Sequence, residues 1–227
     1  MRKKTIVLSL GGSLIIPNNI DTKFLKDFKK TIFQNSKKYK FIIVCGGGSI
    51  ARKYIHALQN KDYKTQSMAG IFCTRTNAKF ISLFFNQNPE TKIPTTMKKV
   101  KEQSKKQDIL FCGALGFKPK QTTDSSAAEI ASYLKSKFIN LTNVLGLYDK
   151  NPKKYKNAKF ISKISWKDFY KITTTKGFKP GQHFVLDQTS SKIILKNKIP
   201  TYILGQNMKN LNNLLKNKEF KGTLIQR

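Results

Sequence analysis

Short apolar runs alternate with amphipathic stretches along this chain of 227 residues. The run 41–45 contains no polar residue, which is typical of a strand buried on both faces of a parallel sheet. In residues 21–33, by contrast, apolar side chains recur at helical spacing with lysines on the opposite face. These patterns predict strands at 5–10, 41–45, 109–112, 138–141, 201–204 and 223–225. They predict helices at 21–33, 49–58, 76–85, 125–133 and 189–196.

Strands that alternate with helices of this length predict an α/β fold, namely a three-layer αβα sandwich with a largely parallel central sheet. No linker rich in Gly, Ser or Pro divides the sequence, so we expect residues 1–227 to form a single domain. Parallel sheets bind their ligands in crevices beyond the carboxyl ends of the strands. We therefore expect the functional residues where the predicted strands end.

Two of the predicted strands end in glycine-rich turns. The first strand leads into Gly11, Gly12 and Ser13, and the second leads into three glycines at 46–48 and then Ser49. We expect Ser49 to cap the following helix, whose free N–H groups would point back toward the glycines. A helix start carries partial positive charge, and bare glycine lets a bulky anion reach the main chain. The two turns thus suit a ligand with several phosphates, or two phosphorylated ligands that meet end to end.

Two familiar phosphate-binding motifs fit these turns poorly. Neither turn ends in the Gly-Lys-Ser/Thr sequence of a Walker loop. Gly46, Gly48 and Ala51 do match the dinucleotide signature Gly-x-Gly-x-x-Ala. However, residues 66–69, where that signature expects an acid for the ribose, include no carboxylate. We therefore disfavour a dinucleotide site.

The formal net charge is +32, from 44 Lys and Arg against 12 Asp and Glu. Clustered cations would favour nucleic-acid binding through counterion release. Here the lysines are spread along the chain, so a solvated basic surface is favoured over a dedicated nucleic-acid site. Such a field also steers anionic substrates inward.

The N-terminus and the cysteines bear on the protein's location. The basic start at 1–4 and the apolar residues after it resemble a signal peptide, but two glycines and Pro17 interrupt the run, which favours a first core strand. No apolar run approaches the roughly 20 residues of a membrane helix. The cysteines show no metal-binding spacing and are expected to be reduced core thiols of a cytoplasmic protein. They are Cys45, Cys73 and Cys112.

The scarcity of acidic residues leaves few candidates for catalysis. Asp124 lies at the start of a predicted helix rich in small residues, where it either caps that helix or belongs to a functional site. Asp187 follows an apolar run and precedes another predicted helix, so it too is a candidate cap. His56, expected on a helix face, and His183 form no pair, and no serine lies in a nucleophile elbow. Covalent catalysis is therefore poorly supported.

A series of segments, taken in order, carries a resemblance. The first half contains Leu-Ser-Leu-Gly-Gly-Ser at 8–13, Gly-Gly-Gly-Ser-Ile-Ala-Arg-Lys-Tyr at 46–54 and Gly-Ile-Phe-Cys-Thr-Arg-Thr-Asn-Ala at 70–78. The second half contributes the segments at 116–124, 142–148, 151–154, 185–187 and 222–223. In this order and spacing they resemble the amino-acid kinase superfamily, and within it the archaeal-type UMP kinases. The resemblance spans essentially the full chain.

This resemblance implies an amino-acid kinase-like fold and transfer of the γ-phosphoryl group from ATP to UMP, with Mg²⁺ accompanying ATP. It also implies a cytoplasmic homo-oligomer, usually a hexamer, in pyrimidine nucleotide synthesis or salvage, with neither membrane nor nucleic acid as a partner. The implied catalytic residues are Gly12, Arg52 and Asp124. The implied ATP-binding residues are Ser9, Leu10, Gly11, Gly12, Ser13, Gly47, Arg52, Thr142, Asn143, Tyr148 and Asn151. The implied UMP-binding residues are Gly46, Ser67, Phe117, Lys118, Pro119, Lys120, Gln121, Thr122 and Thr123. No protein metal site is expected.

Five positions depart from the pattern of that family. Ser9 stands where many superfamily members carry lysine. Ser67, Leu145 and Asn151 stand where aspartates are usual, and these changes either follow the acid-poor composition or signal altered binding of uridine or ATP. Lys120 stands where glycine is usual, and it either contacts an added phosphate or is a solvated loop lysine.

Three other functions stay open at the level of sequence. One is a kinase of another small phosphate such as isopentenyl phosphate, although that branch typically has a histidine in the glycine-rich acceptor region, and His56 lies beyond it. The second is a nucleotide-binding regulator whose catalysis has decayed. The third is a basic nucleic-acid-binding protein.

Overall fold

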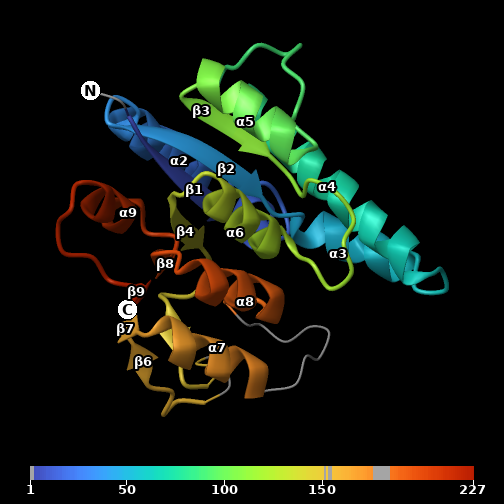
Figure 1. Ribbon diagram of the computed structural model, residues 1–227. Coiled ribbons are helices and arrows are strands. Elements are labelled where there is room, and N and C mark those ends of the chain that lie inside the picture. Colours follow the sequence, from blue (N-terminus) through green and yellow to red (C-terminus); the bar gives the residue numbers. More distant parts are fainter. Residues whose placement is uncertain (1–2, 151, 153–154, 176–184) are drawn as a thin grey trace.

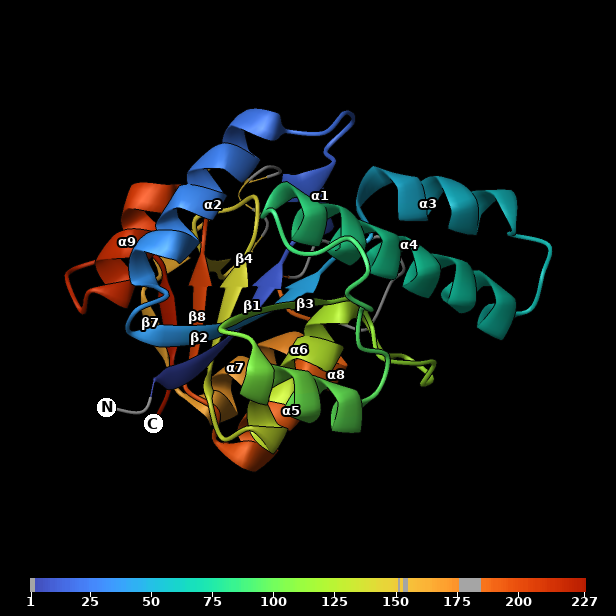
Figure 2. The ribbon, with the colours of Figure 1, turned by 90° about the horizontal axis from the view of Figure 1, so that it is seen from above.

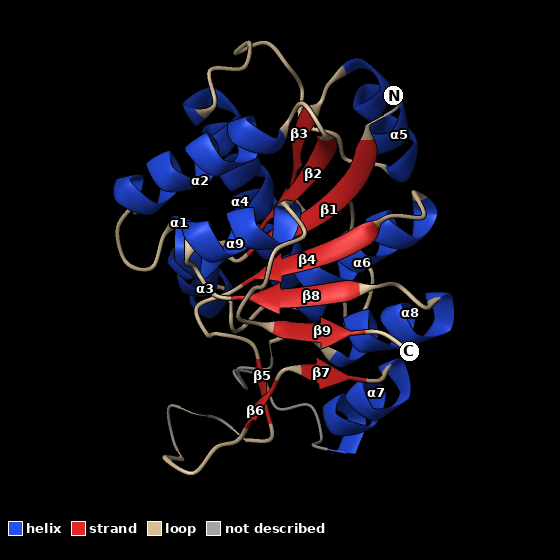
Figure 3. Ribbon diagram, turned by 90° about the vertical axis from the view of Figure 1, so that its left-hand side faces the viewer, coloured by secondary structure: helices blue, strands red, loops and turns tan. Residues whose placement is uncertain are grey.

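A computed structural model of the chain describes residues 3–150, 152, 155–175 and 185–227 (Figure 1). Its centre is a seven-stranded sheet in the order β3-β2-β1-β4-β8-β9-β7 (Figure 3). Five strands run parallel, and β9 pairs antiparallel with β8 and parallel with β7. The strands of this sheet are β1 (Lys4–Leu10), β2 (Tyr39–Cys45), β3 (Ile109–Cys112), β4 (Lys137–Leu141), β7 (Lys163–Ile164), β8 (Thr201–Leu204) and β9 (Thr223–Ile225). A separate antiparallel pair consists of β5 (Leu147–Tyr148) and β6 (Phe160–Ile161).

Helices cover both faces of the sheet, which gives the expected three-layer αβα architecture. One face packs against α1 (Gly12–Ile15), α2 (Thr22–Asn35), α4 (Tyr63–Phe84) and α9 (Met208–Leu215). The other packs against α5 (Met97–Lys106), α6 (Thr123–Tyr133), α7 (Trp166–Thr175) and α8 (Gln188–Asn197). Alternate residues of β1 and β2 enter the two hydrophobic clusters, so these strands are largely apolar because both of their faces are buried.

Helix α3 (Gly48–Ala57) and the outer part of α4 extend away from the sheet as a helical pair (Figures 1 and 2). A glycine allows the two helices to approach closely, because a Cβ atom at Gly70 would lie 3.2 Å from Cδ1 of Ile55. Helix α4 starts at Tyr63, where Asp62 caps it by accepting hydrogen bonds from the amides of Lys64 and Thr65 at 2.9 and 3.1 Å.

All six predicted strands are present, with ends within two residues of those expected. The helix predicted at 76–85 is only the second half of α4, because Gly70 and the polar residues before it hid the first half. Helices α1, α5, α7 and α9 and strands β5 to β7 were not predicted. In α5 the side chain of Val100 is the only one that is buried, so this helix carries little apolar periodicity.

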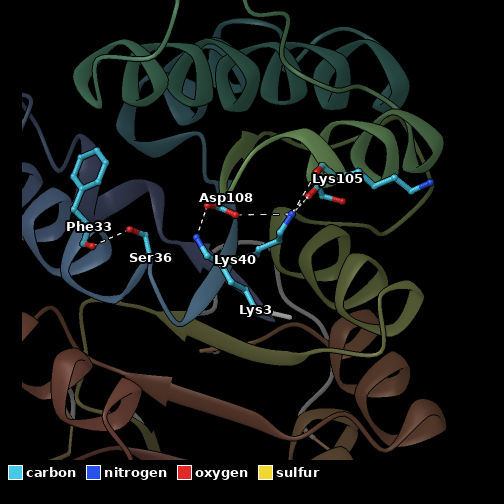
Figure 4. Close-up of polar contacts among 7 residues, drawn as sticks. Lys3, Phe33, Ser36, Lys40, Lys105 and Asp108 are labelled. Carbon is cyan, nitrogen blue, oxygen red and sulfur yellow. Dashed lines mark hydrogen bonds and ion pairs between the residues drawn. The ribbon is translucent and has the colours of Figure 1, made fainter. Parts of the chain in front are cut away.

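Lysines at the amino ends of the strands account for part of the high charge. Lys3 and Lys40 both form ion pairs with Asp108, which precedes β3 (Figure 4). The Lys40 ammonium also donates to the carbonyl of Ser104 at 2.9 Å and so satisfies an acceptor at the C-terminus of α5. Basic side chains at helix C-termini are stabilising because they oppose the helix dipole.

The three cysteines are free and buried, as expected. Burial raises the pKa of the Cys45 and Cys112 thiols, that of Cys112 to about 12, so both stay protonated at neutral pH. Among the described residues, no helix has both the length and the apolar character needed to cross a membrane.

Candidate active site between two glycine turns

The glycine turns that follow β1 and β2 are in direct contact at the carboxyl ends of these neighbouring strands. The Gly46 amide donates to the carbonyl of Leu10 at 2.9 Å. A Cβ atom at Gly12 would lie 2.0 Å from the nitrogen of Gly48, and one at Gly46 would lie 2.4 Å from the nitrogen of Gly12. Side chains are therefore sterically excluded at both positions. The main chains of the two turns therefore lie side by side, which is the arrangement that the sequence predicted for binding phosphates.

The expected helix cap at Ser49 is wrong, because α3 starts one residue earlier. Gly48 adopts a left-handed φ of +68° and Gly47 is the N-cap residue, so the turn is made by glycine backbone alone. The Ser49 hydroxyl is buried within the helix without a hydrogen-bond partner. Arg52, one turn further along α3, is exposed.

Asn77 of α4 braces the second turn and was not predicted as a site residue. Its side-chain amide donates to the carbonyl of Gly46 at 2.7 Å, and it is buried. Two residues earlier, the Arg75 guanidinium donates to the carbonyls of Ala114 and Leu115 at 3.1 and 2.8 Å. The signal was present in sequence, since both residues lie in the segment 70–78. Their contacts, however, depend on how α4 crosses the ends of β2 and β3.

The loop between β3 and α6 contains most of the residues implied to bind the acceptor. Phe117 packs edge-on against Tyr63, with ring centroids 6.0 Å apart. The Lys118 ammonium pairs with Glu129 of α6 at 2.8 Å. Lys120 is exposed and adopts a left-handed φ of +58°. We call residues 117–122 the acceptor loop.

Asp124 lies in the first turn of α6 and its carboxylate accepts a hydrogen bond from the Ser9 hydroxyl of β1 at 2.6 Å. The interpretation of Asp124 as the N-cap is wrong, because Thr122 caps α6 in a capping box with Ser125. Burial raises the pKa of Asp124 to about 7; the hydrogen bond from Ser9 opposes this rise and the charge of Asp187 adds to it. Asp124 is thus a titrating group at the end of the strand that leads into the first glycine turn.

Asp187 caps α8, as its position in the sequence suggested. Its carboxylate accepts from the amide of Ser190 at 2.8 Å and from the hydroxyls of Thr122 and Ser125, the latter at 2.9 Å. A single carboxylate therefore joins the N-termini of α6 and α8.

The residues implied to bind adenosine follow β4. The Thr142 amide donates to the carbonyl of Leu204 at 2.9 Å, and the Gly11 amide donates to the carbonyl of Leu141 at 3.0 Å. Thr142 therefore lies beside the first glycine turn. Asn143 is exposed, and Tyr148 is half-buried against Phe160 with ring centroids 5.4 Å apart.

Two other implied residues are Ser67 and Asn151. Ser67 is half-buried in the first half of α4. Asn151 lies outside the described residues, as does His183. A groove of about 610 Å³ between α2 and α9 is lined by Asp21, Lys23, Lys209 and their neighbours, and by none of the residues implied to bind ATP or UMP.

Residues 4–205 match the amino acid kinase family, and the chain belongs to that family. Curated relatives narrow the class. A uridylate kinase from Thermococcus sibiricus is 32% identical over 97% of this chain and 99% of its own length. A uridylate kinase from Archaeoglobus fulgidus is 32% identical over 97% of this chain and 99% of its own length.

Solved structures agree with this assignment. The crystal structure of uridylate kinase from Archaeoglobus fulgidus superimposes with a TM-score of 0.84 and 31% identity, covering 97% of this chain and 99% of that one. The UMP kinase from Ureaplasma parvum has a TM-score of 0.81 at 24% identity with full coverage of both chains, which supports the fold.

Proposed function

We propose that this chain is a uridylate kinase, which transfers the γ-phosphoryl group of ATP to UMP and releases UDP and ADP. The observation that carries the proposal is the contact between the glycine turns after β1 and β2, in a chain that is 32% identical to archaeal uridylate kinases over 97% of its length. Phosphoryl transfer requires alignment and charge compensation more than covalent chemistry by the protein. Two adjoining turns of bare main chain would provide the alignment of donor and acceptor.

The donor and acceptor would approach this contact from opposite sides. ATP would lie along the turn at 11–13 and the segment that starts at Thr142, with its adenosine near Tyr148. UMP would lie along Gly46 and the acceptor loop. Arg52 would compensate charge on the transferring group from α3. The absence of side chains at Gly12 and Gly46 lets the two turns touch, which would bring the two phosphates close together.

Asp124 would act by orienting groups rather than as a strong base. Its hydrogen bond with Ser9 fixes it beside the first turn, and the ionised form would attract the positive charge that accompanies ATP. Because its pKa lies near neutrality, we expect kcat/KM for ATP to rise as the pH passes through about 7.

Magnesium fits this arrangement as a companion of ATP. Within the described parts of the chain, no three His, Cys, Asp or Glu side chains form a metal-binding group. Mg²⁺ usually keeps several waters and takes substrate phosphates plus one or two carboxylates as ligands. Asp124 is the carboxylate that would hold it, and the ion would supply charge neutralisation for the phosphates.

We also propose that the chain works as one domain within a cytoplasmic homo-oligomer, a hexamer by analogy with related enzymes. Helices α3 and α4 carry exposed large apolar side chains that would be available for contacts between subunits. They are Ile50, Tyr54, Phe72 and Leu83.

A panel of acceptors tests the proposed activity. Purified protein is incubated with ATP, Mg²⁺ and UMP, CMP or isopentenyl phosphate, and the products are separated by ion-exchange chromatography. We expect UDP and ADP in equal amounts, with UMP the preferred acceptor. Turnover of isopentenyl phosphate alone would instead identify a different branch of the family. Binding of ATP without turnover of any acceptor would indicate a regulator, and our proposal would be wrong.

A further inference from the structure

The first turn of α8 holds the acceptor loop at two points. The Thr189 hydroxyl donates to the carbonyl of Lys120 at 2.8 Å. Two residues earlier, the carboxylate of Asp187 accepts from the hydroxyls of Thr122 and Ser125. These partners are separated by more than 60 residues in sequence, so the contacts exist only because α6 and α8 lie side by side on one face of the sheet (Figure 1).

The backbone at Lys120 needs such support. A left-handed conformation costs a residue with a Cβ atom about 1 kcal/mol, and it persists where neighbouring groups fix it. The other described non-glycine residues with positive φ all lie within two residues of a helix C-terminus, where this conformation is common. They are Asn86, Lys135, Lys198 and Asn217. Lys120 instead lies in the acceptor loop, with its amide donating to the Tyr63 hydroxyl at 3.2 Å and its carbonyl bound by Thr189.

Asp187 also acts on Asp124. Its carboxylate accepts hydrogen bonds from Thr122, the N-cap residue of α6, and from Ser125, and so it fixes the turn of α6 that contains Asp124. The other charged groups on these elements are accounted for differently. Lys118 is paired with Glu129. Lys120, on the loop, and Lys192, on α8, are exposed to solvent.

We propose that Asp187 and Thr189 are positioning residues, which fix the acceptor loop in its nucleotide-binding conformation and hold Asp124 at the end of β1. The loop's role in binding the acceptor rests on the proposed function above. Neither residue needs to touch a substrate, because each acts through the loop or through α6. Helix α8 leads into β8, the strand next to the proposed ATP side. Through Asp187 and Thr189 the same helix also sets the geometry of the UMP side.

One pair of substitutions isolates the Thr189 hydrogen bond. Thr189→Val removes the hydroxyl with little change of shape, and Thr189→Ser keeps it. We expect Thr189→Val to raise KM for UMP about 2–10-fold, the usual effect of one hydrogen bond, with KM for ATP nearly unchanged. Thr189→Ser should restore the wild-type KM. Thr174→Val is the matched control, because the Thr174 hydroxyl donates to carbonyls of its own helix, α7, and has no bond to another element among the described residues.

A second substitution tests the link that Asp187 makes between α8 and the start of α6. The two carboxylate oxygens of Asp187 accept from the Ser190 amide and from the hydroxyls of Thr122 and Ser125, whereas asparagine has only one acceptor oxygen. Asp187→Asn can therefore still cap α8 but loses an acceptor for the acceptor loop, so we expect KM for UMP to rise about 2–10-fold and amides of residues 117–122 to exchange faster. Asp21→Asn makes the same change at the cap of α2 and should alter neither quantity. An unchanged KM together with unchanged exchange in Asp187→Asn would refute the role of Asp187.

Hydrogen exchange separates this inference from the proposed function. In the absence of any substrate, we expect amides of residues 117–122 to exchange faster in Thr189→Val than in wild type or in Thr189→Ser. If the wild-type protein fails to phosphorylate UMP but exchange changes in this way, the positioning role stands and the assigned reaction falls. If exchange in the loop is the same in all three proteins, or if Thr189→Val raises both KM values equally, the positioning role is refuted.

Discussion

Replacing Asp124 with asparagine should make the free protein more stable at alkaline pH. The folded-state pKa of about 7 lies well above the ordinary value of 3.8, so the fold favours the protonated carboxyl. Its contribution to stability is complete below about pH 4 and is lost as the pH rises to about 7. From pH 5 to pH 8 the free energy of unfolding falls by an amount that corresponds to about two pKa units, or roughly 2–3 kcal/mol. Asparagine does not ionise, so Asp124→Asn avoids the loss.

Urea unfolding of the substrate-free protein at pH 5 and pH 8, at fixed protein concentration, measures this difference. The unfolding free energy of Asp124→Asn minus that of wild type should increase by about 2–3 kcal/mol from the lower to the higher pH. Glu90→Gln, at an exposed acid, controls for the loss of a negative charge from a chain of net charge +32. A difference that does not change with pH would show that Asp124 is not destabilised by burial, and the reasoning would be refuted.

Three further substitutions test the glycine contact and its surroundings. Gly12→Ala should reduce turnover at least 100-fold and lower Tm, because its Cβ would collide with the second turn. Gly116→Ala is the control: nothing lies within 4 Å of the added Cβ, so its Tm should stay within about 2 °C of wild type. Asn77→Ala leaves a buried carbonyl unpaired and should cost about 1–3 kcal/mol in urea unfolding; an unchanged midpoint would contradict this. Arg52→Met should lower kcat more than it raises KM for UMP in steady-state assays, and a raised KM with unchanged kcat would argue for a ground-state role.

Six of the seven strands of the sheet are predicted by the sequence, because these strands are mostly buried and therefore stand out as largely apolar runs, whereas β7 was missed. The two glycine turns are equally visible, since no other residue type fits where main chain meets main chain. Helix α5 buries a single side chain and α9 is only eight residues long, so the apolar pattern of each is too brief to be recognised in the sequence. The start of α3 was misplaced because a glycine in a left-handed conformation, rather than a serine cap, begins it.

The candidate site was only partly predictable for a related reason. Asp124 and the acceptor loop follow predicted strands and could be located by their order in the chain. The roles of Asn77, Asp187 and Thr189 depend on contacts between elements that are distant in sequence. A capping residue such as Asp187 looks the same in sequence whether it serves its own helix alone or also binds a neighbouring one.

A crystal structure with UMP and a non-hydrolysable ATP analogue tests the central claim most directly. The claim is that donor and acceptor phosphates meet where the turns after β1 and β2 touch. We expect the terminal phosphate of the analogue and the phosphate of UMP to lie next to each other beside Gly12 and Gly46, with uridine against the acceptor loop. Phosphates bound at separate places, or a nucleotide in the groove between α2 and α9 in place of this contact, would contradict the account.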